Sequence, residues 1–241
     1  MTEIWAHRGA TEFAPENTLS AFAKAIQLGA KGTELDVQRT RDGELVVIHD
    51  ETVDRTSNGS GAIADLTFDE VRALDFSNGY ADHAGVQIPT LREVLELLVP
   101  TNLQLNVELK DSIELYPGMG HQVADLVDEV GMTERVLYSS FNHVSIAGLR
   151  DRIPAAQLAL LYEGMLHKPW AYARTVGAGA IHPVGFALQH PDLVRRCHDT
   201  GIAVRTWTIN DPRHIVAMAE MGIDAIITDF PDRALEALEG R

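Results

Sequence analysis

Three carboxylates on expected strands are the residues of this sequence best suited to bind a cation together. Glu34 and Asp36 lie two positions apart in the apolar run 33–37, so both side chains should project to the same face of a strand. Glu108 lies in a second apolar run, 103–109. Two carboxylates about 7 Å apart repel by roughly 2 kcal/mol at an effective dielectric of 20, and a divalent cation relieves this repulsion. Oxygen ligands favour Mg²⁺ or Ca²⁺ over zinc; the open alternative is that these acids pair with Arg or Lys or face the solvent.

His7 and His49 each follow a short apolar run, where a strand is expected to end. Histidine suits proton transfer near neutral pH, and Arg8, directly after His7, can hold a phosphate oxygen through two N–H groups. One histidine among ten says little, because a hydrogen-bonded histidine at a strand end is common. Two of them at strand ends beside an acidic pair together indicate an acid–base site.

Three later residues are open to more than one interpretation. His182 follows the run 180–181 and is equally consistent with a contact to a substrate hydroxyl and with a packed residue before Pro183. Trp207 can form an apolar wall of a pocket, although a tryptophan is more often part of the core. Asp229 is expected in a loop or as a helix cap rather than in catalysis.

The elements that must position these residues alternate along the chain. Runs rich in Val, Ile and Leu are followed by segments of helical periodicity, which is typical of βα units around a parallel sheet. About eight such pairs predict a (β/α)8 TIM barrel, whose chemistry lies at the carboxyl ends of the strands. An open doubly wound sheet is the alternative, but the sequence has no Gly-rich nucleotide turn. The expected strands are 4–6, 33–37, 45–48, 103–109, 136–138, 158–161, 180–182, 203–207 and 225–227, and the expected helices include 18–28, 120–130, 192–199 and 212–221.

Two features modify the regular alternation. Asp42-Gly43 stands between two apolar runs and predicts a β-hairpin. Residues 51–88 are too long and irregular for a simple βα loop, so we interpret them as an insertion over one barrel end, with a short helix near 68–74. The whole chain, 1–241, is otherwise expected to form a single domain.

Composition narrows the class of protein. The formal charge of −15 over 241 residues argues against broad nucleic-acid binding or stable association with an anionic membrane. No apolar run approaches the roughly 18 residues of a membrane span, and the N-terminus lacks the pattern of a signal peptide. Cys197 is the only cysteine, so no intrachain disulfide forms and a cytoplasmic location is expected. The oligomeric state stays open.

Several motifs, in order along the chain, resemble the glycerophosphodiester phosphodiesterase family. They are dense over the first 110 residues and thinner afterwards. The motifs are His7-Arg8-Gly9, Ala14-Pro15-Glu16-Asn17-Thr18, Glu34-Leu35-Asp36-Val37, residues 42–50, Arg55-Thr56-Ser57-Asn58-Gly59-Ser60-Gly61, Val107-Glu108-Leu109-Lys110, residues 206–211 and Ile226-Ile227-Thr228-Asp229.

The resemblance implies a TIM barrel with a small insertion that hydrolyses glycerophosphocholine, glycerophosphoethanolamine and similar diesters to sn-glycerol 3-phosphate and an alcohol. It implies His7 and His49 as general acid and base, acting through a cyclic phosphate. It also implies one Mg²⁺ or Ca²⁺ on the three carboxylates, phosphate contacts from Arg8 and Lys110, and a glycerol pocket lined by His182 and Trp207. The less family-like segments, 118–120 and 163–165, are expected on the leaving-group side.

Three alternatives remain. A related phosphodiesterase for lysophospholipids or glycerophosphoinositol would need an apolar entrance or a basic patch, and the sequence shows neither clearly. A non-catalytic phosphoester-binding barrel should have lost an acid, base or metal residue, and none is missing. A purely structural role leaves the polar strand ends unexplained.

Overall fold

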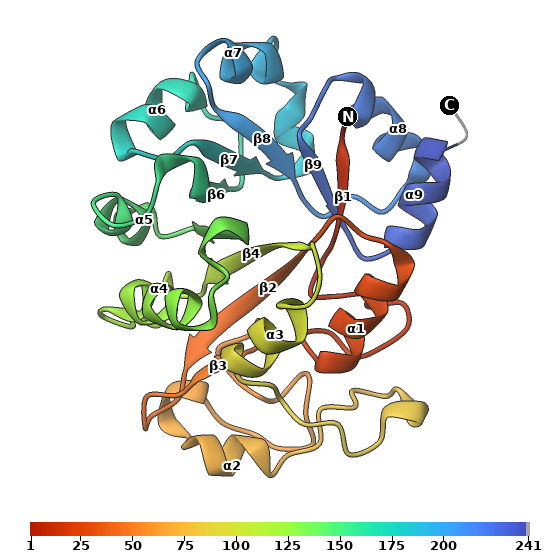
Figure 1. Cartoon of the computed structure of the whole chain (residues 1–241), viewed down its shortest axis with the longest axis vertical. Helices are drawn as coiled ribbons and strands as arrows, with labels where there is room; N and C mark the ends of the chain where they lie inside the picture. The colour runs from red at the N-terminus through yellow and green to blue at the C-terminus, as the bar shows by residue number, and fades with distance from the viewer. Residues whose placement is uncertain (240–241) are drawn as a thin grey trace.

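Eight parallel strands close into a barrel in the computed structural model, which describes residues 1–239 (Figure 1). Neighbouring strands follow the order β1-β9-β8-β7-β6-β5-β4-β2, and pairing of β1 with β2 closes the ring. The predicted (β/α)8 barrel is therefore confirmed. The strands are β1 Glu3–Ala6, β2 Gly32–Arg39, β3 Leu45–Val47, β4 Gln104–Leu109, β5 Val136–Ser140, β6 Leu158–Tyr162, β7 Ala180–Pro183, β8 Ala203–Thr206 and β9 Ala225–Thr228.

Helices follow the strands and cover the outside of the barrel (Figure 1). Leu35 and Val37 of β2 belong to the same buried cluster as Leu91 and Leu95 of the helical layer. Glu34 and Asp36 alternate with them along the strand and therefore face the barrel interior. The α-helices are α1 Leu19–Leu28, α2 Phe68–Arg72, α3 Leu91–Leu98, α4 Met119–Val130, α5 His143–Leu149, α6 Pro169–Val176, α7 Leu193–Asp199, α8 Pro212–Glu220 and α9 Pro231–Glu239; short 3₁₀ segments lie at Ile63–Asp65, Ala81–His83, Thr133–Arg135, Ala155–Gln157 and Gly185–Gln189.

Local signals account for the ends of α1. The hydroxyl of Thr18 accepts a hydrogen bond from the Ala21 backbone, and Gly29 ends the helix in the left-handed conformation at φ +81°. This helix follows the loop that carries His7 and Arg8, so its position fixes the end of that loop against the barrel.

The predicted hairpin joins β2 to β3 in antiparallel pairing, with Val37 opposite Val47. Gly43 in its turn has φ +96°, which favours glycine. Because β3 returns along β2, the chain brings His49 back beside the carboxylates of β2; the Ile48 backbone donates to the carbonyl of Asp36 at 2.9 Å.

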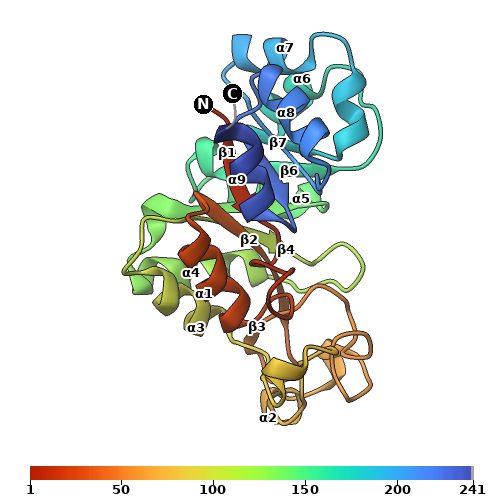
Figure 2. The ribbon, with the colours of Figure 1, turned by 90° about the vertical axis from the view of Figure 1, so that its right-hand side faces the viewer.

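The insertion between β3 and α3 has a small apolar core of its own and projects from the β3 side of the barrel (Figure 2). Its short helix α2 lies where it was expected. Tyr80 and His83 tie the insertion to the first loop through the carbonyls of Thr11 and Phe13. The buried side chains of this core are Val46, Ile48, Val53, Ile63, Val71, Phe76 and Ile88.

Within residues 1–239, no helix has the length and apolar character needed to cross a membrane.

Candidate active site

The carboxylates of Glu34, Asp36 and Glu108 meet at the mouth of the barrel. Parallel pairing of β2 with β4 places Asp36 opposite Glu108, and Glu34 lies on the same face of β2. One oxygen from each residue lies within 4.8 Å of the others, and all three side chains are buried. The structure thus brings together the three residues expected to bind a cation.

The three carboxylates, called the acidic triad below, repel one another in this buried setting. Burial, with Asp36 and Glu108 nearby, raises the pKa of Glu34 well above its usual value. Burial and Asp36 likewise raise the pKa of Glu108 to about 7. Burial alone would raise the pKa of Asp36, but Arg8, His49 and Lys110 hold it below its usual value.

Two cations partly balance the acidic triad. Lys110 Nζ lies 2.9 Å from Glu108 Oε1 and 3.9 Å from Asp36 Oδ1, and Arg8 Nε lies 3.2 Å from Asp36 Oδ2. When all three carboxylates are ionised, the two cations leave one negative charge uncompensated. Asp36 Oδ1 is buried and accepts no hydrogen bond among residues 1–239. A buried carboxylate oxygen without a hydrogen bond, in an excess of negative charge, fits a divalent cation with oxygen ligands.

The turn after His7 directs a backbone N–H group toward the acidic triad. Arg8 has φ +54°, and its N–H donates to Glu34 Oε2 at 3.1 Å. Gly9 follows at φ +86°, where a Cβ would lie 2.6 Å from Ala21. Only glycine fits at this close approach to α1, so the His-Arg-Gly order has a steric cause.

His7 follows β1 and lies between two carboxylates. Its Nδ1 is 2.7 Å from Asp229 Oδ1, while its Nε2 is 4.0 Å from Glu34 Oε2. Burial alone would raise the pKa of Asp229, but His7 and the amide of Asn210 hold it below its usual value. The carboxylate of Asp229 is therefore ionised beside the ring.

His49 has a similar partner from a different source. Its Nδ1 is 2.6 Å from Asp50 Oδ1, and Arg55 of the insertion donates from Nε to Asp50 Oδ2 at 2.6 Å. Arg55 also pairs with Glu16, which in turn pairs with Arg8. Burial lowers the pKa of His49, with Arg8 and Lys110 adding to the effect and Asp36 opposing it. The imidazole of His49 is therefore neutral at neutral pH.

A cavity of about 240 Å³ is lined by both histidines and by Glu34 and Glu108 of the acidic triad. The indole of Trp207 forms part of its wall, meets Phe141 edge-on at 5.6 Å, and donates from Nε1 to the carbonyl of His182. A second hollow of about 480 Å³ shares Glu108, Lys110, Phe141, Leu161 and Glu163 with the first, so the two form one cleft. The first cavity is lined by His7, Arg8, Glu34, His49, Asn106, Glu108, Lys110, Phe141, Leu161, Glu163, Trp207, Thr208 and Ile227.

The ring of His182 lies outside this cavity. It is fully buried in β7, and both ring nitrogens lack a hydrogen-bond partner within residues 1–239. Burial, with a smaller effect of Arg205, lowers the pKa of His182 well below its usual value. The ring is therefore packed among buried residues, and the carbonyl of His182 accepts from Trp207 Nε1. The contact of His182 with a substrate hydroxyl stays a prediction.

Asp229 lies in the loop between β9 and α9, one of the two places expected for it. The sequence did not predict that its carboxylate contacts His7, Thr11 and Asn210. The available signal was its position: like His7, it directly follows a barrel strand at the carboxyl end.

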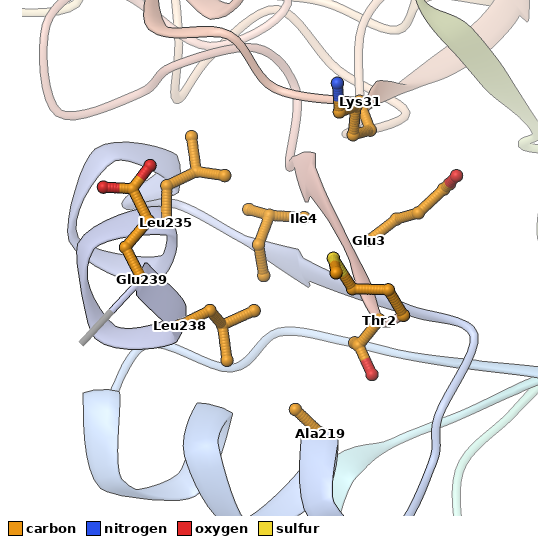
Figure 3. A pocket seen from close by; sticks show the side chains of 9 residues that line it. Thr2, Glu3, Ile4, Lys31, Ala219, Leu235, Leu238 and Glu239 are labelled. Carbon is orange, nitrogen blue, oxygen red and sulfur yellow. The ribbon is translucent and has the colours of Figure 1, made fainter. Parts of the chain in front are cut away.

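The opposite end of the barrel has a larger hollow of about 720 Å³, shown in Figure 3. Ile4, Leu235 and Leu238 give it an apolar lining, with α8 and α9 on its walls. It contains no histidine, and it lies at the amino end of β1 rather than at the carboxyl ends of the strands. The acidic triad and both candidate histidines are absent from it.

The charge at the acidic triad predicts how stability and cation binding depend on pH. The pKa of Glu108 is about 7 in the folded chain and about 4.5 when unfolded, so the folded state binds the extra proton between these values. Without a cation, stability should therefore fall as pH rises from about 4.5 to 7, by up to about 3 kcal/mol. Because ligands must be ionised, added Mg²⁺ should raise Tm more at pH 8 than at pH 6 in calorimetry. An equal rise at both pH values would contradict this assignment.

A barrel whose mouth joins a carboxylate triad to two histidines and two cationic side chains has the composition of a phosphodiesterase site. Residues 7–233 match the model of the "Glycerophosphoryl diester phosphodiesterase family". The chain belongs to this family, whose members are hydrolases, and the resemblance found in its sequence motifs is confirmed.

Relatives and solved structures agree with this assignment over nearly the whole chain. A glycerophosphodiester phosphodiesterase of Caldanaerobacter subterraneus subsp. tengcongensis is 43% identical over 96% of this chain and 95% of its own length. One from Bacillus altitudinis is 41% identical over 99% of each. The structure of an Oleispira antarctica phosphodiesterase in complex with the product sn-glycerol-3-phosphate has a TM-score of 0.84 at 27% identity, covering 99% of this chain and 97% of that one.

Proposed function

We propose that this chain hydrolyses glycerophosphodiesters, such as glycerophosphocholine and glycerophosphoethanolamine, to sn-glycerol 3-phosphate and an alcohol. The observation that carries the proposal is one cavity lined by His7, His49 and two carboxylates of the acidic triad, Glu34 and Glu108. The product in the Oleispira antarctica relative supports the same product here. Residues 1–241 are proposed to act as one domain, with the family match over residues 7–233 as support. A cytoplasmic location, supported by a single buried cysteine, is proposed with it.

The acidic triad is proposed to hold one Mg²⁺ or Ca²⁺, since its donors are all oxygens and Asp36 Oδ1 has no hydrogen bond within residues 1–239. When bound, such a cation polarises the phosphoryl group and lowers the pKa of a nearby hydroxyl. Arg8 and Lys110 line the cavity with their charges beside the acidic triad, so they are proposed to bind phosphate oxygens.

The two histidines are proposed to exchange protons in two steps. One accepts the proton of the glycerol 2-hydroxyl, whose oxygen attacks phosphorus, while the other donates a proton to the departing alkoxide. The P–O bond to the alcohol breaks and a cyclic phosphate forms. Water then opens the ring with the roles of the histidines reversed. Because the nucleophile belongs to the substrate, the reaction avoids the entropy cost of binding a separate nucleophile. This lowers the activation free energy by several kcal/mol.

A panel assay tests the function as a whole. Release of glycerol 3-phosphate, followed with a coupled dehydrogenase, is compared for glycerophosphocholine, glycerophosphoethanolamine, glycerophosphoglycerol and glycerophosphoinositol, with Mg²⁺ and Ca²⁺ in parallel. Lysophosphatidylcholine, assayed by choline release, tests the lysophospholipid alternative. Turnover of a water-soluble glycerophosphodiester supports the proposal; no glycerol 3-phosphate from any of them would refute it.

The second hollow is proposed to receive the leaving alcohol. Glu51 and Glu163 lie on its wall, beside the aromatic ring of Phe141. Carboxylates and an aromatic face favour a cationic head group. We expect Glu163→Gln to raise KM for glycerophosphocholine several-fold more than KM for glycerophosphoglycerol. Equal changes of KM for both substrates would show that the head group binds elsewhere. Glu134→Gln serves as the control, because Glu134 lines neither hollow.

A further inference from the structure

Asp229 has contacts that leave little room for a purely structural role. Its Oδ1 lies 2.7 Å from His7 Nδ1 and its Oδ2 accepts from Asn210 Nδ2 at 2.7 Å. Within the described chain, 1–239, this carboxylate has hydrogen bonds with side chains and none with a backbone N–H of α9. Both carboxylate oxygens are thus occupied by side chains at the mouth of the barrel.

Asn210 fixes the direction of this carboxylate. Its side-chain oxygen accepts from the Asp229 backbone and from the Thr228 hydroxyl, both at 3.0 Å, while its amide nitrogen donates to the carboxylate. One amide therefore contacts the backbone and the side chain of Asp229. This leaves Oδ1 directed at His7.

An ionised carboxylate only accepts hydrogen bonds, so the proton on His7 Nδ1 is fixed by its partner. The other nitrogen, Nε2, is then the one that gains or loses a proton. It faces the acidic triad, 4.0 Å from Glu34 Oε2. Asp229 thereby determines both which nitrogen is reactive and where that nitrogen points.

We propose that Asp229, held by Asn210, is a positioning residue for the hydrolysis: it keeps His7 in the Nδ1–H tautomer with Nε2 directed at the reacting phosphate. It acts through His7 and does not itself touch the substrate. His49 is supported separately, by Asp50 and the Arg55 guanidinium, so the two histidines are oriented by different parts of the chain.

The test uses the full chain with Mg²⁺ and glycerophosphocholine. Asp229→Asn keeps the shape of the side chain but offers an N–H to His7 Nδ1, which favours the wrong tautomer. We expect kcat to fall by at least about 100-fold with KM changed by less than about threefold. The ¹⁵N ring shifts of His7 should move toward the Nε2–H form. Asp211→Asn, a change in an exposed carboxylate that caps α8, is the matched control and should keep its kcat.

A second comparison separates action through His7 from a general effect on the fold. In a His7→Ala background, followed under single-turnover conditions with excess enzyme, Asp229→Asn should cause no further loss. Asn210→Ala leaves the carboxylate in place but loosens it, so a smaller fall in kcat at constant KM is expected. An additional loss of tenfold or more in the His7→Ala background would overturn the proposal. So would a change confined to KM, or unaltered ring shifts in Asp229→Asn. If Asp229→Asn does not fold, Asn210→Ala is compared in the wild-type and His7→Ala backgrounds instead. A loss of kcat in the wild-type background alone supports the proposal, and an equal loss in both backgrounds overturns it.

Discussion

Replacing His7 or His49 with alanine is expected to lower kcat by about 10²–10⁴-fold. Each histidine lines the cavity that also contains Glu34 and Glu108, and each has its Nδ1 within hydrogen-bond distance of a carboxylate. Loss of either ring should remove one of the two proton transfers, because within residues 1–239 no histidine other than these two lines the cavity. The measurement is steady-state release of glycerol 3-phosphate from glycerophosphocholine.

The fold should survive both substitutions, since the rings are partly exposed and outside the apolar core. Circular dichroism and Tm check this. His198→Ala is the matched control: His198 lies on α7, pairs with Asp224, and does not line the cavity. Wild-type kcat in either His7→Ala or His49→Ala, with a folded protein, would remove that residue from the mechanism.

Removal of divalent cations should abolish turnover reversibly. When fully ionised, the acidic triad carries one more charge than Arg8 and Lys110 balance. A chelator is therefore expected to leave residual activity below about one part in 10³, restored by Mg²⁺ or Ca²⁺. Asp36→Asn should give a similar loss that added cation does not restore. Calorimetric titration with each cation measures binding directly, apart from activity.

Asp36 contacts Arg8 and Asn17 as well, so its variant needs two controls. Asp151→Asn changes a fully solvated carboxylate and should alter neither binding nor turnover. Glu108→Gln relieves repulsion in the acidic triad, so it should raise the stability of the cation-free protein while weakening cation binding. Full activity after exhaustive chelation would exclude a cation from the reaction.

The strand-level features of this site were predictable because they follow from period and pairing. Glu34 and Asp36 share a face since residues two apart in a strand always do, and Leu35 between them packs on the helical layer. The hairpin at Gly43 returns the chain to the same end of the barrel, which brings His49 near them. Glu108 lies beside these two carboxylates because β2 pairs directly with β4. The local sequence does not specify this pairing; only the order of the elements along the chain indicates it.

Two residues show what the sequence did not determine. His182 and Trp207 both stand near strand ends, yet one ring is fully buried and the other lines the cavity. The difference depends on the stagger of neighbouring strands: β7 continues to Pro183, and Val184 pairs with Trp207 beyond it. The expectation of a loop or helix cap for Asp229 used only local preferences, whereas its partner His7 is 222 positions away in the chain.

The bridge that Arg55 forms between Asp50 and Glu16 sets a rule for loop exchange among barrels of this kind. A designer who transplants residues 51–88 to alter substrate access would also transplant the guanidinium that steadies the support of His49. A graft lacking an arginine at this position would remove the ion pair to Asp50. Glu16 would then pair with Arg8 only. Altered selectivity in such a chimera would then be confounded with slower proton transfer, unless the arginine and both of its carboxylate partners travel together.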